Sequence, residues 1–149
     1  MAIARGVGTE IIRSTLIHNL DSSSKKIIIG EQHHIYTVLS IIVKVESIQA
    51  AGNWVKCWMK GYDSGSGESN QDFVLFRQDM QSNLTFVWND KFSFNGYEPV
   101  DFSGNMDDAT KQNAVADQGS GAAQHMEIYT EHADDNFDVF CTYIDKNNA

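Results

Sequence analysis

Cysteine is scarce in this sequence, with two residues in 149, Cys57 and Cys141. There is no CxxC pair and no cluster of Cys with His, which argues against a zinc site. Both cysteines lie inside apolar, strand-like runs, "WVKCWMKGY" and "FDVFCTYI". Because a disulfide requires two Cα atoms within roughly 7 Å, two buried free thiols are favoured over a bridge.

Positive charge is also scarce. Lys and Arg together number 11 against 20 Asp and Glu, which gives a formal net charge of −9. A sequence-independent nucleic-acid binder needs clustered Lys and Arg, and so does a protein that binds an anionic membrane surface. The charge therefore argues against both partners and favours either simple solubility or a more basic partner.

Long apolar segments are absent. No run reaches the roughly 18 residues of a membrane span. The N-terminal "MAIARGVGTEIIRS" lacks the apolar region of a signal peptide. We therefore expect neither a membrane anchor nor export.

Catalytic and cofactor motifs are missing as well. There is no GxSxG, and the glycine-rich pieces lack the lysine of a phosphate-binding loop. His33 and His34 are adjacent, so a strand would point them to opposite faces. The acidic turn "EHADDN", residues 131–136, offers oxygen ligands for calcium but not in the EF-hand order. We therefore predict no catalytic, cofactor-binding or metal-binding residue and no enzyme activity. A glycosidase carboxylate pair, which is set by distance in space, stays open as an alternative.

Strand-like alternation is what the sequence does contain. In residues 34–48 the odd-numbered positions are almost all apolar and should face the core; they are Ile35, Thr37, Leu39, Ile41, Val43 and Val45. Residues 54–62 alternate as clearly. One parity there holds Val55, Cys57 and Met59, and the other holds Trp54, Lys56, Trp58 and Lys60.

Turn signals recur roughly every 8–15 residues between these runs. This pattern predicts an all-β fold, an antiparallel β-sandwich of about eight strands with jelly-roll-like connections. At most one short helix is expected, within residues 107–118. We expect an N-terminal arm at residues 1–9 and a single domain at 10–149, which is long enough to bury a core without a disulfide or metal.

The stretch "TFVWNDKFSFNG" places one aspartate, Asp90, among aromatic residues of the same parity. An unpaired carboxylate on a buried face costs several kcal/mol, whereas Asn and Asp favour turns. We therefore interpret residues 89–91 as a turn or kink between two strands, with a functional carboxylate as the alternative.

Two tryptophans and two arginines are the candidate interaction residues. Trp54 and Trp58 share the lysine-bearing, more exposed parity of residues 54–62. Such a pair can stack on a sugar, but aromatic packing against a neighbouring subunit or within a half-covered sheet is the commoner explanation. Arg5 lies in the arm of an otherwise acidic chain and Arg13 follows soon after it. A neighbouring subunit could order this segment.

Five segments carry a resemblance to a known family: "MAIARGVGTEIIRS", "HHIYTVLSIIV", "TFVWNDKFSFNGYEP", "ADQGSGAAQ" and "FDVFCTYID". In these segments the chain resembles small virion structural proteins of tailed bacteriophages, of the marine or cyanobacterial phage type. The resemblance covers most of the chain, and its motifs are structural rather than catalytic. One departure follows Gly96, where Tyr97 and Glu98 stand in place of the glycine–aspartate pair that often follows such a strand break.

The resemblance implies a non-enzymatic, jelly-roll-like subunit, made in the host cytoplasm and present in many copies on the virion. Capsid decoration, as a cement or accessory protein on the shell of major capsid protein, is the first role it implies. The alternative is a tail or fibre component that binds a carbohydrate or receptor. It further implies a homo-oligomer without cofactors, nucleic acid or membrane, and analogy with decoration proteins on three-fold positions points to a trimer.

Overall fold

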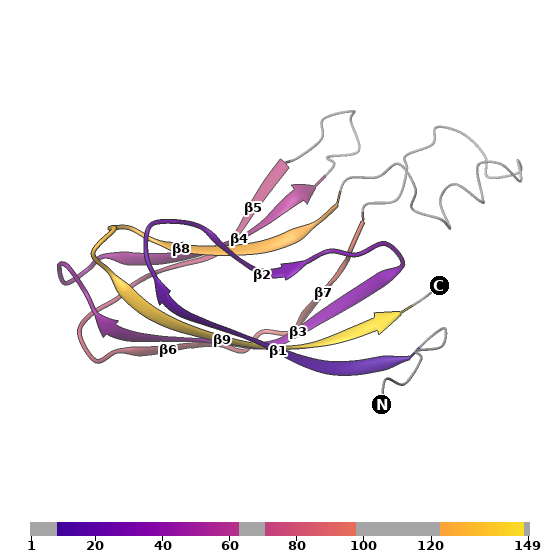
Figure 1. Cartoon of the computed structure of the whole chain (residues 1–149), viewed down its shortest axis with the longest axis horizontal. Helices are drawn as coiled ribbons and strands as arrows, with labels where there is room; N and C mark the ends of the chain where they lie inside the picture. The colour runs from indigo at the N-terminus through magenta and orange to yellow at the C-terminus, as the bar shows by residue number, and fades with distance from the viewer. Residues whose placement is uncertain (1–8, 63–70, 98–122, 148–149) are drawn as a thin grey trace, which may run out of the picture.

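The computed structural model describes residues 9–62, 71–97 and 123–147. These residues form nine β-strands in two antiparallel sheets that lie face to face (Figure 1), and they contain no helix. The predicted all-β sandwich is therefore confirmed. The segment expected to hold a short helix, 107–118, and most of the expected N-terminal arm lie outside the described residues.

Each sheet is built from strands that are far apart in the sequence. Sheet A has the order β1 (Glu10–Leu20), β9 (Asn136–Asn147), β3 (His34–Ser47) and then β6 (Thr85–Trp88), with β7 (Phe92–Asn95) also paired to β3. Sheet B has the order β2 (Lys25–Ile29), β8 (His125–Thr130), β4 (Trp54–Tyr62) and β5 (Gln71–Asp79).

This strand order is that of a jelly roll. If β6 and β7 are counted as one interrupted strand, the chain has eight strands, and the first, last, third and sixth form one sheet. The second, seventh, fourth and fifth form the other. Two interlocked Greek keys produce this arrangement, so the jelly-roll-like connectivity is confirmed.

The break between β6 and β7 answers the question posed by Asp90. Both strands pair with β3, with Trp88 opposite Ile41 and Phe92 opposite Val38. Residues 89–91 interrupt this edge strand, and Asp90 is exposed. The structural interpretation is therefore confirmed, and the interruption is why the structure has nine strands rather than about eight.

One half of β3 turns the opposite way from the prediction. Ile41, Val43 and Val45 face the core as expected, but in the first half Tyr36 and Val38 are the buried residues. The register against β9 shifts between Val38 and Ser40, which is a β-bulge. One extra residue at a bulge reverses the facing of every side chain on one side of it. Because both parities are apolar here, the alternation did not reveal the bulge.

The core lies between the two sheets and contains both cysteines. Its fully buried large side chains come from both sheets, among them Phe137, Ile41, Met59, Met126 and Ile128. Cys57 and Cys141 are buried in this core and free, as predicted. Burial raises the pKa of both thiols, that of Cys141 to about 12.

We expect neither thiol to react in the folded protein. The thiolate is the reactive form, and a raised pKa together with burial keeps it rare at pH 8. In a titration with a thiol-reactive disulfide reagent, we expect fewer than about 0.1 thiol per chain to react without denaturant. In denaturant, both thiols, 2 per chain, should react. Rapid reaction of one thiol in the native protein would show that the core opens at that strand.

Candidate interaction surface

Strand β4 presents two contrasting faces. Val55, Cys57 and Met59 are buried in the core, as their parity predicted. Trp54 and Trp58 lie on the outer face of sheet B, where they are half-buried. Since the core is on the other side of the strand, contact with neighbouring strands must cover them.

Tyr129 of β8 provides that contact for both tryptophans. Its ring centroid lies 5.2 Å from that of Trp54, in an edge-to-face arrangement, and 5.2 Å from that of Trp58. The register explains this, because Tyr129 pairs with Lys56, the residue midway between the two tryptophans. Diagonal neighbours across two strands are within reach of aromatic side chains. The three rings therefore form one continuous cluster.

Three cations lie over these rings. The Nζ of Lys60 is 4.1 Å from the centroid of Trp58, and the Nζ of Lys56 is 5.3 Å from the same ring. The guanidinium of Arg77, on β5, is 5.1 Å from the ring of Trp54. A cation within about 6 Å of a ring face is attracted by about 0.5–1 kcal/mol at exposed sites.

We call this set the aromatic–cation surface; it consists of Trp54, Trp58, Tyr129, Lys56, Lys60 and Arg77. It holds three of the 11 Lys and Arg residues of an acidic chain. Carboxylates border it, among them that of Glu127, which lies 3.6 Å from the Nζ of Lys60. Trp, Tyr and Arg are the residues most enriched among binding hot spots. The surface can therefore contact a partner through both aromatic side chains and positive charge.

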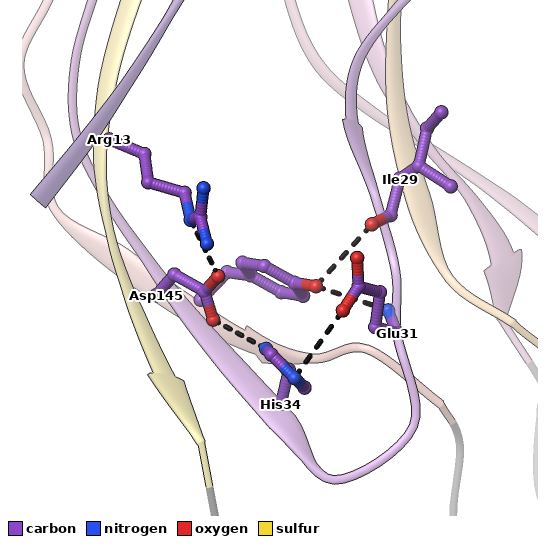
Figure 2. Close-up of polar contacts among 6 residues, drawn as sticks. Arg13, Ile29, Glu31, His34 and Asp145 are labelled. Atoms are coloured by element: carbon purple, nitrogen blue, oxygen red, sulfur yellow. Dashed lines mark hydrogen bonds and ion pairs between the residues drawn. The ribbon is translucent and has the colours of Figure 1, made fainter. Parts of the chain in front are cut away.

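Arg13, the third candidate residue, belongs to a different part of the molecule. It lies on β1 in sheet A, where its Nε donates to Oδ2 of Asp145 at 2.9 Å (Figure 2). The structure therefore does not bring Arg13 together with Trp54 and Trp58. Arg5 lies outside the described residues.

Asp145 is the buried centre of a polar cluster that joins three strands. Its Oδ1 lies 2.6 Å from Nδ1 of His34, and Nε2 of the same ring lies 3.4 Å from the carboxylate of Glu31 (Figure 2). Because carboxylates face both ring nitrogens, neither is directed at a substrate. The cluster ties β1, β3 and β9 to the loop before β3, and its geometry is that of a structural brace.

Tyr36 extends this brace. The backbone N–H of Glu31 donates to its hydroxyl oxygen at 3.1 Å, and the hydroxyl donates to the carbonyl of Ile29 at 3.4 Å. Burial raises the pKa of this phenol, so it stays protonated and can keep donating at neutral pH. Tyr36 therefore joins sheet A to the end of β2 in sheet B.

The acidic turn at residues 131–136 also has internal roles. Asp135 is buried and accepts hydrogen bonds from the backbone N–H of Gln49 at 2.9 Å and of His132 at 3.1 Å. Oε2 of Glu131 accepts from the backbone N–H of Trp54 at 3.2 Å. Among residues 9–62, 71–97 and 123–147, no group of three or more His, Cys, Asp or Glu is arranged to hold a metal ion. The same residues include no helix long and apolar enough to cross a membrane.

Tyr129 and Arg77 are members of the surface that the sequence reading missed. The alternation of "HMEIYT" could have placed Tyr129 on an outer face, since Met126 and Ile128 are buried. No local pattern in the sequence indicated that β8 and β5 pair with β4. The outer-face position of the two tryptophans could be predicted, but their partners could not.

No protein-family model matches this sequence, and no curated protein matches it. Among solved structures, the chain is similar to one described by the words "Bacillus endospore appendages form a novel family of disulfide-linked pili". The similarity covers 100% of this chain and 97% of the other, with 12% sequence identity and a TM-score of 0.43. A likeness this distant carries no information about function.

Proposed function

We propose that this chain is a non-enzymatic structural protein of a bacteriophage virion, which decorates the capsid by binding the major capsid protein. The observation that carries the proposal is the aromatic–cation surface on the outer face of sheet B. The phage-like segments of the sequence supply the identity of the particle. In this role the chain needs no cofactor and acts on the outer surface of the capsid.

The composition of the surface supports a protein partner. Its three rings form one cluster, and the cations that lie over them restrict their rotamers, so less entropy is lost on binding. Lys56, Lys60 and Arg77 add positive charge to a chain of net charge −9. Complementary charge selects partner and orientation more than it adds affinity. We therefore expect the contacted patch of the shell to be acidic around an apolar centre.

A second candidate function is carbohydrate or receptor binding as a tail or fibre component. Trp54 and Trp58 lie four residues apart on one strand face, with Tyr129 of the neighbouring strand between their rings, and such rings can stack on sugars. However, Lys60 and Arg77 already lie over the tryptophan faces, and a sugar would have to displace them. This geometry favours the protein partner.

The test is occupancy of virions stripped of this protein and titrated with the Trp58→Ala variant. Loss of a hot-spot aromatic costs about 2 kcal/mol or more, so we expect binding about 30-fold weaker than that of the unchanged protein. Phe73→Ala is the matched control, since Phe73 is an exposed aromatic outside the surface. Its affinity should stay within about twofold.

Three other outcomes would contradict parts of the proposal. No binding of the unchanged protein to any virion would remove the virion role. Equal binding by Trp58→Ala would place the contact elsewhere on the molecule. Saccharide binding on a glycan array that is lost in Trp58→Ala, without capsid binding, would establish the second candidate instead.

A further inference from the structure

The outer face of sheet A carries an apolar row that no described part of the chain covers. Pairing places Leu16 beside Phe140, Phe140 beside Ile42, and Ile42 beside Val87, so the row crosses β1, β9, β3 and β6. Leu16 is 56% exposed, Val87 51% and Phe140 40%. In Figure 1 sheet A forms the lower layer, and no described element lies below it.

A second row extends the same face. Ile12, which is 69% exposed, pairs with Ile144, and Ile144 pairs with Thr37. Between the two rows lie small hydroxyl side chains, among them Ser14 and Thr142, which pair directly. The face thus has one apolar row across four strands, a separate Ile12–Ile144 pair and an uncharged centre. A contiguous exposed apolar row of this kind marks an interaction site.

The charges on this face lie at its two ends. At one end Glu10 lies opposite Lys146 in the strand register. At the other end Nδ1 of His18 lies 3.2 Å from Asp138, and Nζ of Lys44 lies 2.9 Å from Glu46; these six residues are the charged or titratable side chains of the face. Two lysines and three carboxylates give the face a formal charge of −1 with His18 neutral, against −9 for the chain.

The face is large enough for a stable dimer. β9 has 12 residues, which at roughly 3.3 Å each span about 40 Å, and four strands about 4.8 Å apart span about 19 Å. One face therefore covers about 750 Å², and two faces in contact would bury about 1,500 Å². Stable interfaces bury about 1,200–2,000 Å² in total, and two thirds of the estimate still reaches about 1,000 Å².

We propose that the outer face of sheet A packs against the same face of a second copy of this chain, related by a two-fold axis. Two copies of net charge −9 repel each other over most of their surface. The nearly neutral, apolar face of sheet A is where two copies can approach. Its lysines and carboxylates nearly balance, so the face does not call for a partner of a particular charge. The proposal does not depend on the virion role, because the aromatic–cation surface on the other sheet stays free.

Sedimentation equilibrium of the full chain tests this interface. The unchanged protein should have twice the 16.7 kDa mass of the chain at concentrations of about 10–100 μM. Ile12→Lys and Phe140→Lys each place two like charges in the symmetric interface. We expect each to weaken dimerisation about 100-fold or more.

Matched controls are available on the other sheet. Ile29 is 63% exposed and Phe73 is 60% exposed, so Ile29→Lys and Phe73→Lys add the same charge to exposed apolar positions outside the face. Both variants should remain dimeric. If a lysine variant fails to fold, as judged by circular dichroism, the milder Leu16→Ser and Val87→Ser variants take its place.

Several outcomes would overturn the proposal. They are a monomeric unchanged protein at 100 μM, a trimer, or a dimer that the substitutions in sheet A leave intact. A dimer disrupted equally by Ile29→Lys would show that added charge alone, rather than this face, controls association.

Discussion

Replacing Asp145 by alanine is expected to lower the free energy of unfolding by about 2–4 kcal/mol. The carboxylate is buried, and it lies 2.6 Å from His34 and 2.9 Å from Arg13. Without it, the nearly buried His34 ring loses its closest partner. The partly exposed Arg13 can turn to water, which keeps the cost below that of a fully buried pair. Urea unfolding followed by circular dichroism measures the loss.

Asp138→Ala is the matched control for this prediction. Asp138 lies on the same strand, and its partner His18, 3.2 Å away, is well exposed. Ion pairs at the surface contribute about 0–1 kcal/mol, so the loss should not exceed about 1 kcal/mol. If the two variants lose the same free energy of unfolding, Asp145 stabilises the fold no more than an ordinary ion pair at the surface does.

The Asp145 brace shows what the sequence could not predict. Arg13 and Asp145 are 132 positions apart, and His34 and Asp145 are 111 apart. Each residue looks like an ordinary polar end of a strand when it is read alone. They meet only because β9 lies between β1 and β3, and this order follows from jelly-roll closure rather than from a local pattern.

Parity was the informative signal where one face of a strand is buried. It placed Val55, Cys57 and Met59 in the core and left Trp54 and Trp58 outside, because Lys56 and Lys60 share the parity of the tryptophans and make that set the more polar one. In β3 both parities are apolar, and the same reasoning put the wrong residues inward before the bulge. A strand that packs on one face and carries an apolar binding face on the other gives no such contrast.

This ambiguity itself has a physical meaning. Ile42 is on the outer face of β3, in the same row as Leu16, Phe140 and Val87. A chain that only had to stay soluble would gain nothing from an apolar row there. An apolar residue such as Ile42 on the outer parity lowers the contrast between the two faces of β3, and it also belongs to the row that supports the dimer face.

Gly61→Ala is the substitution we expect to damage the fold most within sheet B. Gly61 has φ +93°, a conformation that L-residues rarely adopt, and an added Cβ would overlap the backbone carbonyl oxygen of Ala123. Backbone strain costs about 1–2 kcal/mol, and forced overpacking adds about 1–3 kcal/mol. We therefore expect a total loss of about 2–5 kcal/mol, measured by urea unfolding.

Gly52→Ala separates the two contributions. Gly52 has φ +92°, nearly the same backbone strain, but an added Cβ would meet nothing within 4 Å. It should lose only the strain of about 1–2 kcal/mol. If both variants lose the same free energy, the overlap with Ala123 relaxes at no cost and the approach of the two backbones is not tight.

The Gly61 variant also tests how the aromatic–cation surface is held. Gly61 follows Lys60 at the end of β4, and Ala123 precedes β8, the strand that carries Tyr129. Pushing the two backbones apart should move β4 away from β8 and separate Trp58 from Tyr129, now 5.2 Å apart. We expect a changed tryptophan emission spectrum in Gly61→Ala and an unchanged one in Gly52→Ala. An unchanged spectrum in a destabilised Gly61→Ala variant would show that pairing further along β4 and β8, rather than this end, positions the rings.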